Sequence, residues 1–431
     1  MSRTSVLADA DAQASRSEGS ESFFSVAALL CLGAIMLDGL DTALVGIAGP
    51  AIIRGYDVPA SSLTAAFVAT NIGAALGYIV SGPLSRRWNE RLVLILSVAL
   101  FGALTLATPA APSIYWLAGF RLVTAIALGC ALPAAICFVV ARVADDKVGP
   151  TTIFVASGLA LGGVLGGLSG SAILLRYGWQ SLFYLGGVLP IVISAALAAW
   201  LPSRSKESPA AIGEIAPPIA GGGLLAREVR VRSICLWAFS FLIFAEAYAL
   251  LFWIPILLTG YGHAAGNASF GVAVFSVGGL IANVVLVFLV RTLPVSRVLL
   301  GYVGLALASV VCLSFAGSVL WTALFAIAAS GAALIGCSVG QSALATLLYP
   351  HPVRATGIGV AAAFGRVGST VGPAAIGSLL ALGWSGDRIL LVSAAPLVLA
   401  FVALVVFEAA RPNRAGLREG TPTPANRTTT Y

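Results

Sequence analysis

Five charged residues lie within long apolar stretches of this 431-residue chain: Asp38, Asp41, Arg121, Glu246 and Arg366. A single Asp or Arg at the centre of a membrane-spanning helix costs about 2.5–3.5 kcal/mol on insertion scales. Five such groups without partners would together cost on the order of 12–18 kcal/mol. A typical net folding stability is only about 5–15 kcal/mol. These side chains must therefore face one another, water or a ligand rather than lipid.

The three acidic residues are candidates for binding protons. Asp38 and Asp41 are three residues apart, so they share one face of a helix. Two carboxyl groups this close disfavour each other's ionisation, and burial disfavours it further, which suits a group that takes up and releases protons near neutral pH. We predict proton coupling at Asp38 and Asp41. The alternative is that they only accept hydrogen bonds from backbone or hydroxyl groups. Glu246 is either a second proton site or a permanently neutral buried acid.

The two arginines are candidates for binding an anion, because a guanidinium forms two parallel hydrogen bonds with a carboxylate. Arg366 is flanked by Gly365 and Gly368, which leave space for a ligand or a neighbouring helix. We favour substrate contact for Arg366 over the alternative of a structural ion pair. For Arg121, substrate contact and a structural ion pair with Asp38 or Asp41 are equally open.

Two aromatic residues, Phe244 and Tyr248, are four residues apart and form another face of the helix that carries Glu246. Rings beside a binding cavity stack on a ring-bearing substrate. The competing interpretation is that both rings serve only in packing or as interface anchors. The sequence leaves both interpretations open.

The elements that position these residues are predicted to be membrane-spanning helices. The chain is 59% hydrophobic and 10% charged, whereas soluble domains carry about 25% charged residues. A spanning helix needs about 20 mostly apolar residues and satisfies its backbone hydrogen bonds internally. Twelve spans are predicted: 24–47, 62–84, 91–108, 113–141, 150–175, 181–201, 231–258, 266–290, 295–316, 319–348, 356–382 and 388–410.

The longest connection divides these spans six and six. We predict a disordered tail at 1–22, a six-helix bundle at 23–201, a linker at 202–230, a second bundle at 231–410 and a disordered tail at 411–431. The fold class is therefore an all-α integral membrane protein with two pseudo-symmetric bundles. Transporters built this way bind substrate near the membrane midplane between the halves.

The distribution of positive charge predicts the orientation. If the N-terminus is inside, 19 of the 24 Lys and Arg residues lie in inside segments and three in outside loops. Lys and Arg concentrate on the cytoplasmic side of membrane proteins. We therefore expect both termini to be cytoplasmic in a multi-pass protein of the cell's inner membrane. The net charge of +7 is then explained by positive residues in the cytoplasmic segments, and no nucleic-acid partner is expected.

Residue types that mark enzymes and metal sites are scarce. The six cysteines fall in apolar stretches without a CxxC pair, and the only histidines, His263 and His351, lie in predicted loops. We expect no metal and no cofactor, with transport driven by a proton gradient, and we do not expect an enzyme. A membrane sensor without transport is a remote alternative, because both tails and the linker are too short and polar for a folded domain. The expected partners are a small organic carboxylate, protons and the lipid bilayer, and the expected state is a monomer.

Several motifs occur together along the chain. Their order is Asp38-Gly39-Leu40-Asp41 with Pro50-Ala51, then Arg121 through Gly129 to Pro133, then Gln341-Ser342 and Tyr349-Pro350, then Arg354-Ala355-Thr356-Gly357 and Gly365-Arg366-Val367-Gly368. Over residues 25–408 the chain resembles the major facilitator superfamily, and within it the aromatic acid:proton symporter family. The resemblance implies the major facilitator fold and proton-driven uptake of aromatic carboxylates such as hydroxybenzoates or phenylpropionates. It also implies importance for Asp38, Asp41, Arg121 and Arg366.

The chain departs from the superfamily pattern in the loop after the second span. Where the family has G-x-L-x-D-R-x-G-R-K, this chain reads G-P-L-S-R-R-W-N-E-R over residues 82–91. The resemblance implies a gating role for this loop, here carried by Arg86, Arg87, Glu90 and Arg91, with the charge pair moved or reversed.

A proton-coupled exporter is the alternative transport mode. The glycines of the fifth span, from Gly158 to Gly167, resemble the antiporter motif of that helix, except that Gly163 replaces its proline. We favour uptake, because symporters of the family carry similar glycines.

Overall fold

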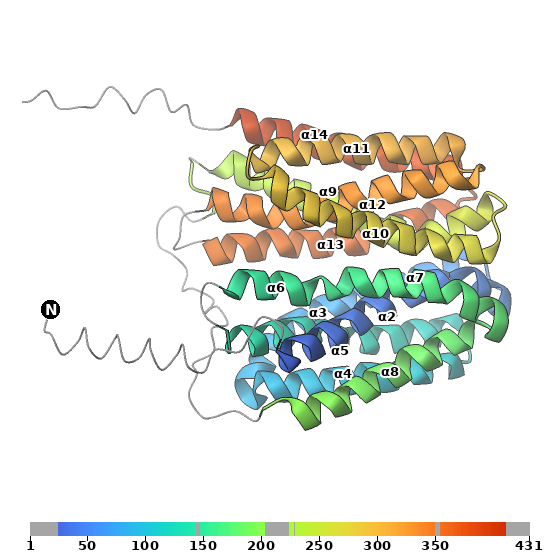
Figure 1. Ribbon diagram of the computed structural model, residues 1–431. Coiled ribbons are helices and arrows are strands. Elements are labelled where there is room, and N and C mark those ends of the chain that lie inside the picture. The colour runs from blue at the N-terminus through green and yellow to red at the C-terminus, as the bar shows by residue number, and fades with distance from the viewer. Residues whose placement is uncertain (1–24, 144–146, 203–223, 228, 350–353, 411–431) are drawn as a thin grey trace, which may run out of the picture.

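The computed structural model describes residues 25–143, 147–202, 224–227, 229–349 and 354–410 (Figure 1). Within these residues all regular structure is helical. The α-helices are α2 (Val26–Tyr56), α3 (Thr64–Trp88), α4 (Glu90–Ala107), α5 (Ile114–Val140), α6 (Val148–Ala156), α7 (Gly158–Tyr177), α8 (Trp179–Trp200), α9 (Arg230–Gly260), α10 (Ala265–Leu289), α11 (Val295–Ala316), α12 (Leu320–Leu348), α13 (Arg354–Ala381) and α14 (Gly386–Ala409), and two 3-10 turns are η1 (Ala60–Leu63) and η2 (Thr108–Ala110).

Ten of the described helices are long and apolar enough to cross a membrane, judged on length and composition. Two further crossings complete the predicted twelve. One is α13, which has 28 residues, and the other is the consecutive pair α6 and α7. The predicted fold class, an all-α multi-pass membrane protein, is confirmed.

Two predicted spans differ from the observed helices. The sequence predicts that the first span ends at residue 47, but α2 continues through Pro50 to Tyr56. A proline is tolerated here because neighbouring helices surround this part of α2, which is buried from Ala43 to Pro50. The fifth span, predicted as one helix, is broken at Ser157, whose hydroxyl donates to the Phe154 carbonyl at 2.6 Å.

The two halves of the chain, α2–α8 and α9–α14, repeat one packing pattern. In the first half α2 packs against α7, α3 against α5, and α4 against α8. In the second half the corresponding pairs are α9 with α13, α10 with α12, and α11 with α14. The same order of partners in both halves is the predicted pseudo-symmetry.

Within the described residues, the most extensive contacts between the halves are made by α7 with α10, α3 with α13, and α2 with α9. Glycines make the α7–α10 contact close, since a Cβ on Gly167 would collide with the backbone of Ala273 and a Cβ on Gly163 with the hydroxyl of Ser276. Gly162, on the other side of α7, lies against the backbone of α2. The glycine run that resembles an antiporter motif thus lets α7 pack closely against α2 on one side and against α10 of the second half on the other.

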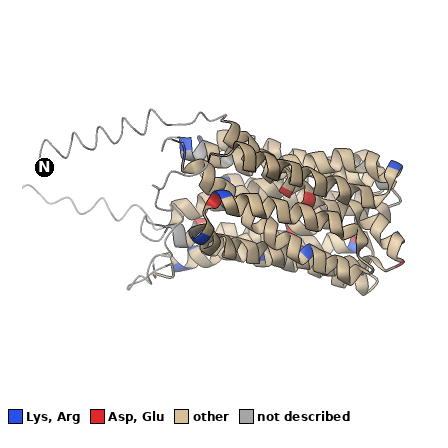
Figure 2. Cartoon of the chain, turned by 90° about the horizontal axis from the view of Figure 1, so that it is seen from below, with Lys and Arg blue, Asp and Glu red and all other residues tan. Residues whose placement is uncertain are grey.

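The two ends of the bundle are distinguished by the helix termini that they contain. The tail face is the end where α2 begins and α14 ends, at the left of Figure 1. The far face is the opposite end, where α2 ends at Tyr56 and α9 ends at Gly260. Figure 2 shows that charged residues are few along the helices, with a small number of acidic positions in the body of the bundle.

The contact between α9 and α13 yields a test of the packing. A Cβ on Gly372 would collide with the Ala245 carbonyl oxygen, so we expect Gly372→Ala to lower the free energy of unfolding by about 1–3 kcal/mol. The matched control is Gly359→Ala in the same helix, where an added Cβ meets nothing within 4 Å. Thermal unfolding of both purified variants measures the difference, and equal midpoints would contradict the close approach of α9 and α13.

Candidate functional site

A fully buried ion pair lies inside the first half. Arg121 Nη2 on α5 is 2.8 Å from Asp41 Oδ2 on α2, and both side chains are 0% exposed. The hydroxyl of Thr105 on α4 donates to Asp41 Oδ1 at 2.6 Å, and Arg121 Nε donates to Thr70 Oγ1 on α3 at 3.4 Å. Four helices therefore supply one polar cluster. Of the two interpretations of Arg121, the structure shows the ion pair.

The energetics explain why these groups occur together. Removing an ion from water costs several kcal/mol, and the attraction between the two charges offsets this only when the remaining hydrogen-bonding groups also find partners. The two threonines supply such partners, although Arg121 Nη1 has none among the described residues. The pair links α2 to α5, so a change in the charge of Asp41 alters the interaction between these two helices.

Arg366 connects the two halves. Its guanidinium carbon lies 4.3 Å from the centroid of the Tyr78 ring, which α3 contributes from the first half. Its guanidinium also hydrogen-bonds Tyr248 on α9 and interacts electrostatically with Asp38 on α2. A cation over an aromatic face is stabilised by the ring quadrupole. The charge of Arg366 is therefore shared among groups from both halves.

The two arginines differ in how open they are. Arg121 is fully buried, whereas Arg366 and Tyr78 are both partly exposed. Asp38 is only 6% exposed and accepts a hydrogen bond from Thr42 at 3.5 Å. Arg366 is therefore the arginine that a dissolved anion reaches more easily, at a position between the halves.

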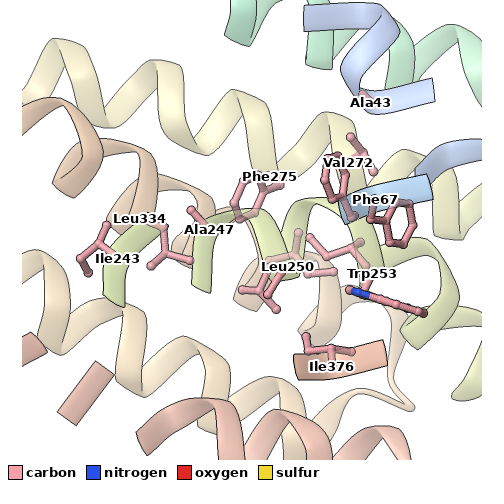
Figure 3. Packing of buried hydrophobic residues seen from close by; sticks show 14 of the residues in the cluster. Ala43, Phe67, Ile243, Ala247, Leu250, Trp253, Val272, Phe275, Leu334 and Ile376 are labelled. Carbon is pink, nitrogen blue, oxygen red and sulfur yellow. The ribbon is translucent and has the colours of Figure 1, made fainter. Parts of the chain in front are cut away.

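An aromatic series leads from Arg366 to the contact between the halves. Tyr248 stacks on Phe244 at 6.3 Å between ring centroids and meets the edge of Phe252 at 5.9 Å. Phe252 in turn stacks on Phe67 of the first half at 4.8 Å, and Phe67 meets Trp253 edge-on at 5.1 Å. Figure 3 shows Phe67 and Trp253 within the buried core.

This group of Phe67, Phe252 and Trp253, here called the aromatic plug, joins the halves on the far-face side of Arg366. The three rings are buried. Phe67 follows the far-face start of α3, and Phe252 lies one turn beyond Tyr248 toward the far-face end of α9. The plug therefore separates Arg366 from the far face in this conformation.

Not every predicted site residue joins this cluster. Glu246 is 2% exposed and hydrogen-bonds Ser393 on α14, away from the contact between the halves, and its Oε1 has no hydrogen-bond partner among the described residues. Phe244 and Tyr248 do lie beside Arg366, since Phe244 packs against Gly365. Tyr78 was missed, because a tyrosine in an apolar span carries no sequence signal for its partner.

The predicted gating loop makes contacts within the first half. Arg91 donates to the carbonyl oxygens of Ala198 at 2.7 Å and Leu201 at 3.1 Å, which ties α4 to the end of α8. Asn89 caps α4 by accepting from the Leu92 N–H at 2.9 Å, with φ at 68°. Arg87 is exposed, and Glu90 lies in the acidic first turn of α4. The side chain of Arg86 lies outside the described part of the chain.

Comparison with known proteins defines the family. A model of the Major Facilitator Superfamily matches residues 31–297, and the chain belongs to this superfamily. The chain is 32% identical to the 3-(3-hydroxy-phenyl)propionate transporter of Escherichia coli, over 89% of this chain and 93% of that protein. It is 28% identical to the 4-hydroxybenzoate transporter PcaK of Pseudomonas aeruginosa, over 88% of this chain and 91% of that protein.

Solved structures agree on the fold. A bacterial homologue of the human lysosomal transporter Spinster, inward-facing and unoccupied, superposes with a TM-score of 0.72 at 17% identity, covering 92% of this chain and 100% of that chain. The D-xylose-proton symporter superposes with a TM-score of 0.70 at 16% identity, covering 90% of this chain and 98% of that chain. The resemblance to the aromatic acid:proton symporter family is confirmed, and the chain is an integral membrane transporter rather than an enzyme.

The buried ion pair can be tested through stability. We expect Arg121→Gln to lower the free energy of unfolding by about 3–5 kcal/mol, because Asp41 keeps a buried charge without its partner. Thr105→Val removes one hydrogen bond to that carboxylate and is expected to cost about 1.5–3 kcal/mol. The matched control is Thr346→Val, an exposed threonine that donates to a carbonyl of its own helix. The free energy of unfolding is measured in detergent for all three variants. Equal losses in the three would contradict the stabilising role of the ion pair.

Proposed function

We propose that the chain is a secondary active transporter that takes up a small aromatic carboxylate together with protons. The observation that carries this proposal is the position of Arg366, partly exposed and shared between the halves beside Tyr78, Tyr248 and Asp38. Transporters of this architecture bind substrate between their halves. The two relatives are named as transporters of hydroxylated aromatic acids. Such acids carry a carboxylate, which a guanidinium binds, and a ring, which packs against aromatic side chains.

Substrate recognition follows from the groups around Arg366. The guanidinium binds the carboxylate with two parallel hydrogen bonds. The ring of the substrate lies against Tyr248 and Phe244, whose rings are nearly parallel at 14° and adjacent to the guanidinium. Tyr78 holds the guanidinium from the first half, so a bound anion changes a contact that both halves share.

Proton coupling uses Asp38 and Asp41 on α2. A substrate carboxylate on Arg366 repels Asp38 and therefore favours its protonation. Asp41 on α2 forms an ion pair with Arg121 on α5, and protonation of Asp41 would weaken that ion pair. Substrate and proton thereby favour each other's binding, which is the requirement for symport. Glu246, buried between α9 and α14, is a second proton site or a neutral structural acid.

Alternating access is supported by the aromatic plug. The plug lies on the far-face side of Arg366 and closes the path from the far face to that residue in this conformation. Opening toward the far face requires Phe67 to separate from Phe252 and Trp253. The gating loop, with Arg86, Arg87, Glu90 and Arg91, lies on the tail face and tunes the balance between the two conformations.

The setting of the transporter completes the proposal. The distribution of Lys and Arg supports an inner-membrane location with the tail face, and both termini, in the cytoplasm. The conformation with the plug closed is then closed toward the outside of the cell. The two six-helix bundles, 23–201 and 231–410, move relative to each other across the linker at 202–230. The proton gradient drives uptake without a cofactor, and one chain is the functional unit.

Arg366 is tested by a substitution that keeps its charge. We expect Arg366→Lys to weaken 4-hydroxybenzoate binding by about 10- to 100-fold, because one charge-assisted hydrogen bond of the bidentate pair is lost. Arg297→Lys, at an exposed position near the start of α11, is the matched control and should leave binding unchanged. Calorimetric titration of both purified variants measures the effect, and unchanged affinity in Arg366→Lys would remove the residue from the binding site.

Proton coupling is tested in proteoliposomes with an imposed proton gradient. We expect Asp41→Asn to abolish accumulation of labelled 4-hydroxybenzoate while keeping exchange of labelled for unlabelled substrate, because exchange requires no net proton movement. Asp38→Asn, measured in parallel, shows which carboxyl group carries the coupled proton. Accumulation at the wild-type level by Asp41→Asn would exclude this residue from coupling.

A further inference from the structure

A cavity lies at the far face, between the two halves. It has a volume of about 490 Å³. The first half contributes Arg54 from the last turn of α2, and the second half contributes Thr259 and Tyr261 at the end of α9, Leu380 of α13, and Ser385 and Asp387 at the start of α14. Pockets that bind small molecules range over about 300–1,000 Å³. The cavity is therefore large enough for a small organic acid.

The cavity is separate from the site at Arg366. Its lining residues lie at the far-face ends of α2 and α9, and Phe252 and Trp253 of the aromatic plug lie one to two turns deeper along α9. A molecule in this cavity would therefore face the far-face solvent while the plug keeps it from Arg366.

The charges around the cavity leave one cation without a counter-charge. Within the described part of the chain, Arg54 forms no ion pair, and its side chain is exposed. The other charged group in the lining, the Asp387 carboxylate, accepts hydrogen bonds from the Ser385 hydroxyl and from the backbone N–H groups of Asp387 and Arg388. Asp387 lies in the first turn of α14, where that helix N-terminus and Arg388 offset its charge.

An aromatic wall and hydroxyl groups complete the lining. Tyr261 is held in place by a hydrogen bond from its hydroxyl to the Ser314 carbonyl at 3.3 Å. Burial, with a further contribution from Asp387, raises the pKa of Tyr261, so it remains a neutral donor. Leu380 adds an apolar surface, and Thr259 and Ser385 add hydroxyl groups. The cavity thus offers a guanidinium, a fixed ring and an apolar wall, the same combination that surrounds Arg366.

We propose that this cavity is an outer capture site, which holds a small organic carboxylate on Arg54 before the aromatic plug opens. The inference rests on the proposed function, since it takes the transported acid as its ligand. Arg54 attracts the anion from solution and raises its concentration at the closed plug. When the plug opens, the acid moves from the guanidinium at the far face to the guanidinium between the halves.

The test uses a cysteine placed in the lining as a reporter. Ala60 of η1 lines the cavity and is partly exposed, so Ala60→Cys is labelled with a membrane-impermeant maleimide, and the rate at this position is followed by peptide mass spectrometry in nanodiscs. We expect 4-hydroxybenzoate at about four times its Kd to slow labelling by roughly fivefold, because the rate falls by a factor of one plus the ratio of ligand concentration to Kd when the occupied site shields the cysteine. Adding Arg54→Gln to the reporter should abolish the protection. Adding Arg176→Gln, an exposed far-face arginine outside the cavity, should leave it intact.

A further variant separates local binding from a conformational effect of the site between the halves. Protection should persist when Arg366→Lys is added to the reporter, because the capture site binds without that arginine. Protection that disappears with Arg366→Lys, or that persists with Arg54→Gln, would overturn the proposal. Absence of protection in a reporter that still binds 4-hydroxybenzoate by calorimetry would also overturn it and leave the proposed function standing. Absence of both would count against the proposed function itself.

A kinetic measurement gives an independent readout. We expect Arg54→Gln to raise the KM for uptake by roughly three- to tenfold at low ionic strength, with an unchanged maximal rate and a weaker dependence of KM on salt. Arg176→Gln should change neither quantity. A fall in maximal rate with an unchanged KM would contradict a capture role for Arg54.

Discussion

A guanidinium between two helical bundles in a membrane is stable only while other groups share its charge, and this constraint governs the whole structure. Arg366 meets the constraint with groups from both halves, the Tyr78 ring from one side and the Tyr248 hydroxyl from the other. Any motion that separates the halves removes one of these partners. In the proposed mechanism a substrate carboxylate replaces the lost partner, which links the arrangement of the bundles to the occupancy of the site.

The second buried arginine meets the same constraint differently. Arg121 finds its counter-charge, Asp41, within its own half, together with hydroxyl groups from neighbouring helices. This pair joins α2 to α5 within the first bundle. Arg121 therefore stabilises one bundle, whereas Arg366 contacts groups from both bundles. Asp38 lies on α2, the helix that also carries Asp41, and interacts electrostatically with Arg366.

Much of this could be predicted from the sequence, because isolated charges and long apolar runs are physical signals that need no tertiary context. The twelve spans and the six-and-six division belong to this class. Other features depend on how each helix is rotated against its neighbours. The sequence predicts Pro50 beyond the end of the first helix, but the proline is accommodated inside it, and Glu246, a candidate second proton site, faces α14. The contact between Arg366 and Tyr78 of α3 could not be predicted for the same reason.

The most direct test of this mechanism is a structure of the protein with 4-hydroxybenzoate bound. We expect both carboxylate oxygens to lie within hydrogen-bonding distance of the Arg366 guanidinium and the ring of the acid to lie beside Tyr248 and Phe244. Asp38 should then have moved away from the guanidinium or accepted a proton. A ligand bound away from the contact between the halves, with Arg366 still packed on Tyr78 and Asp38 unmoved, would contradict the mechanism.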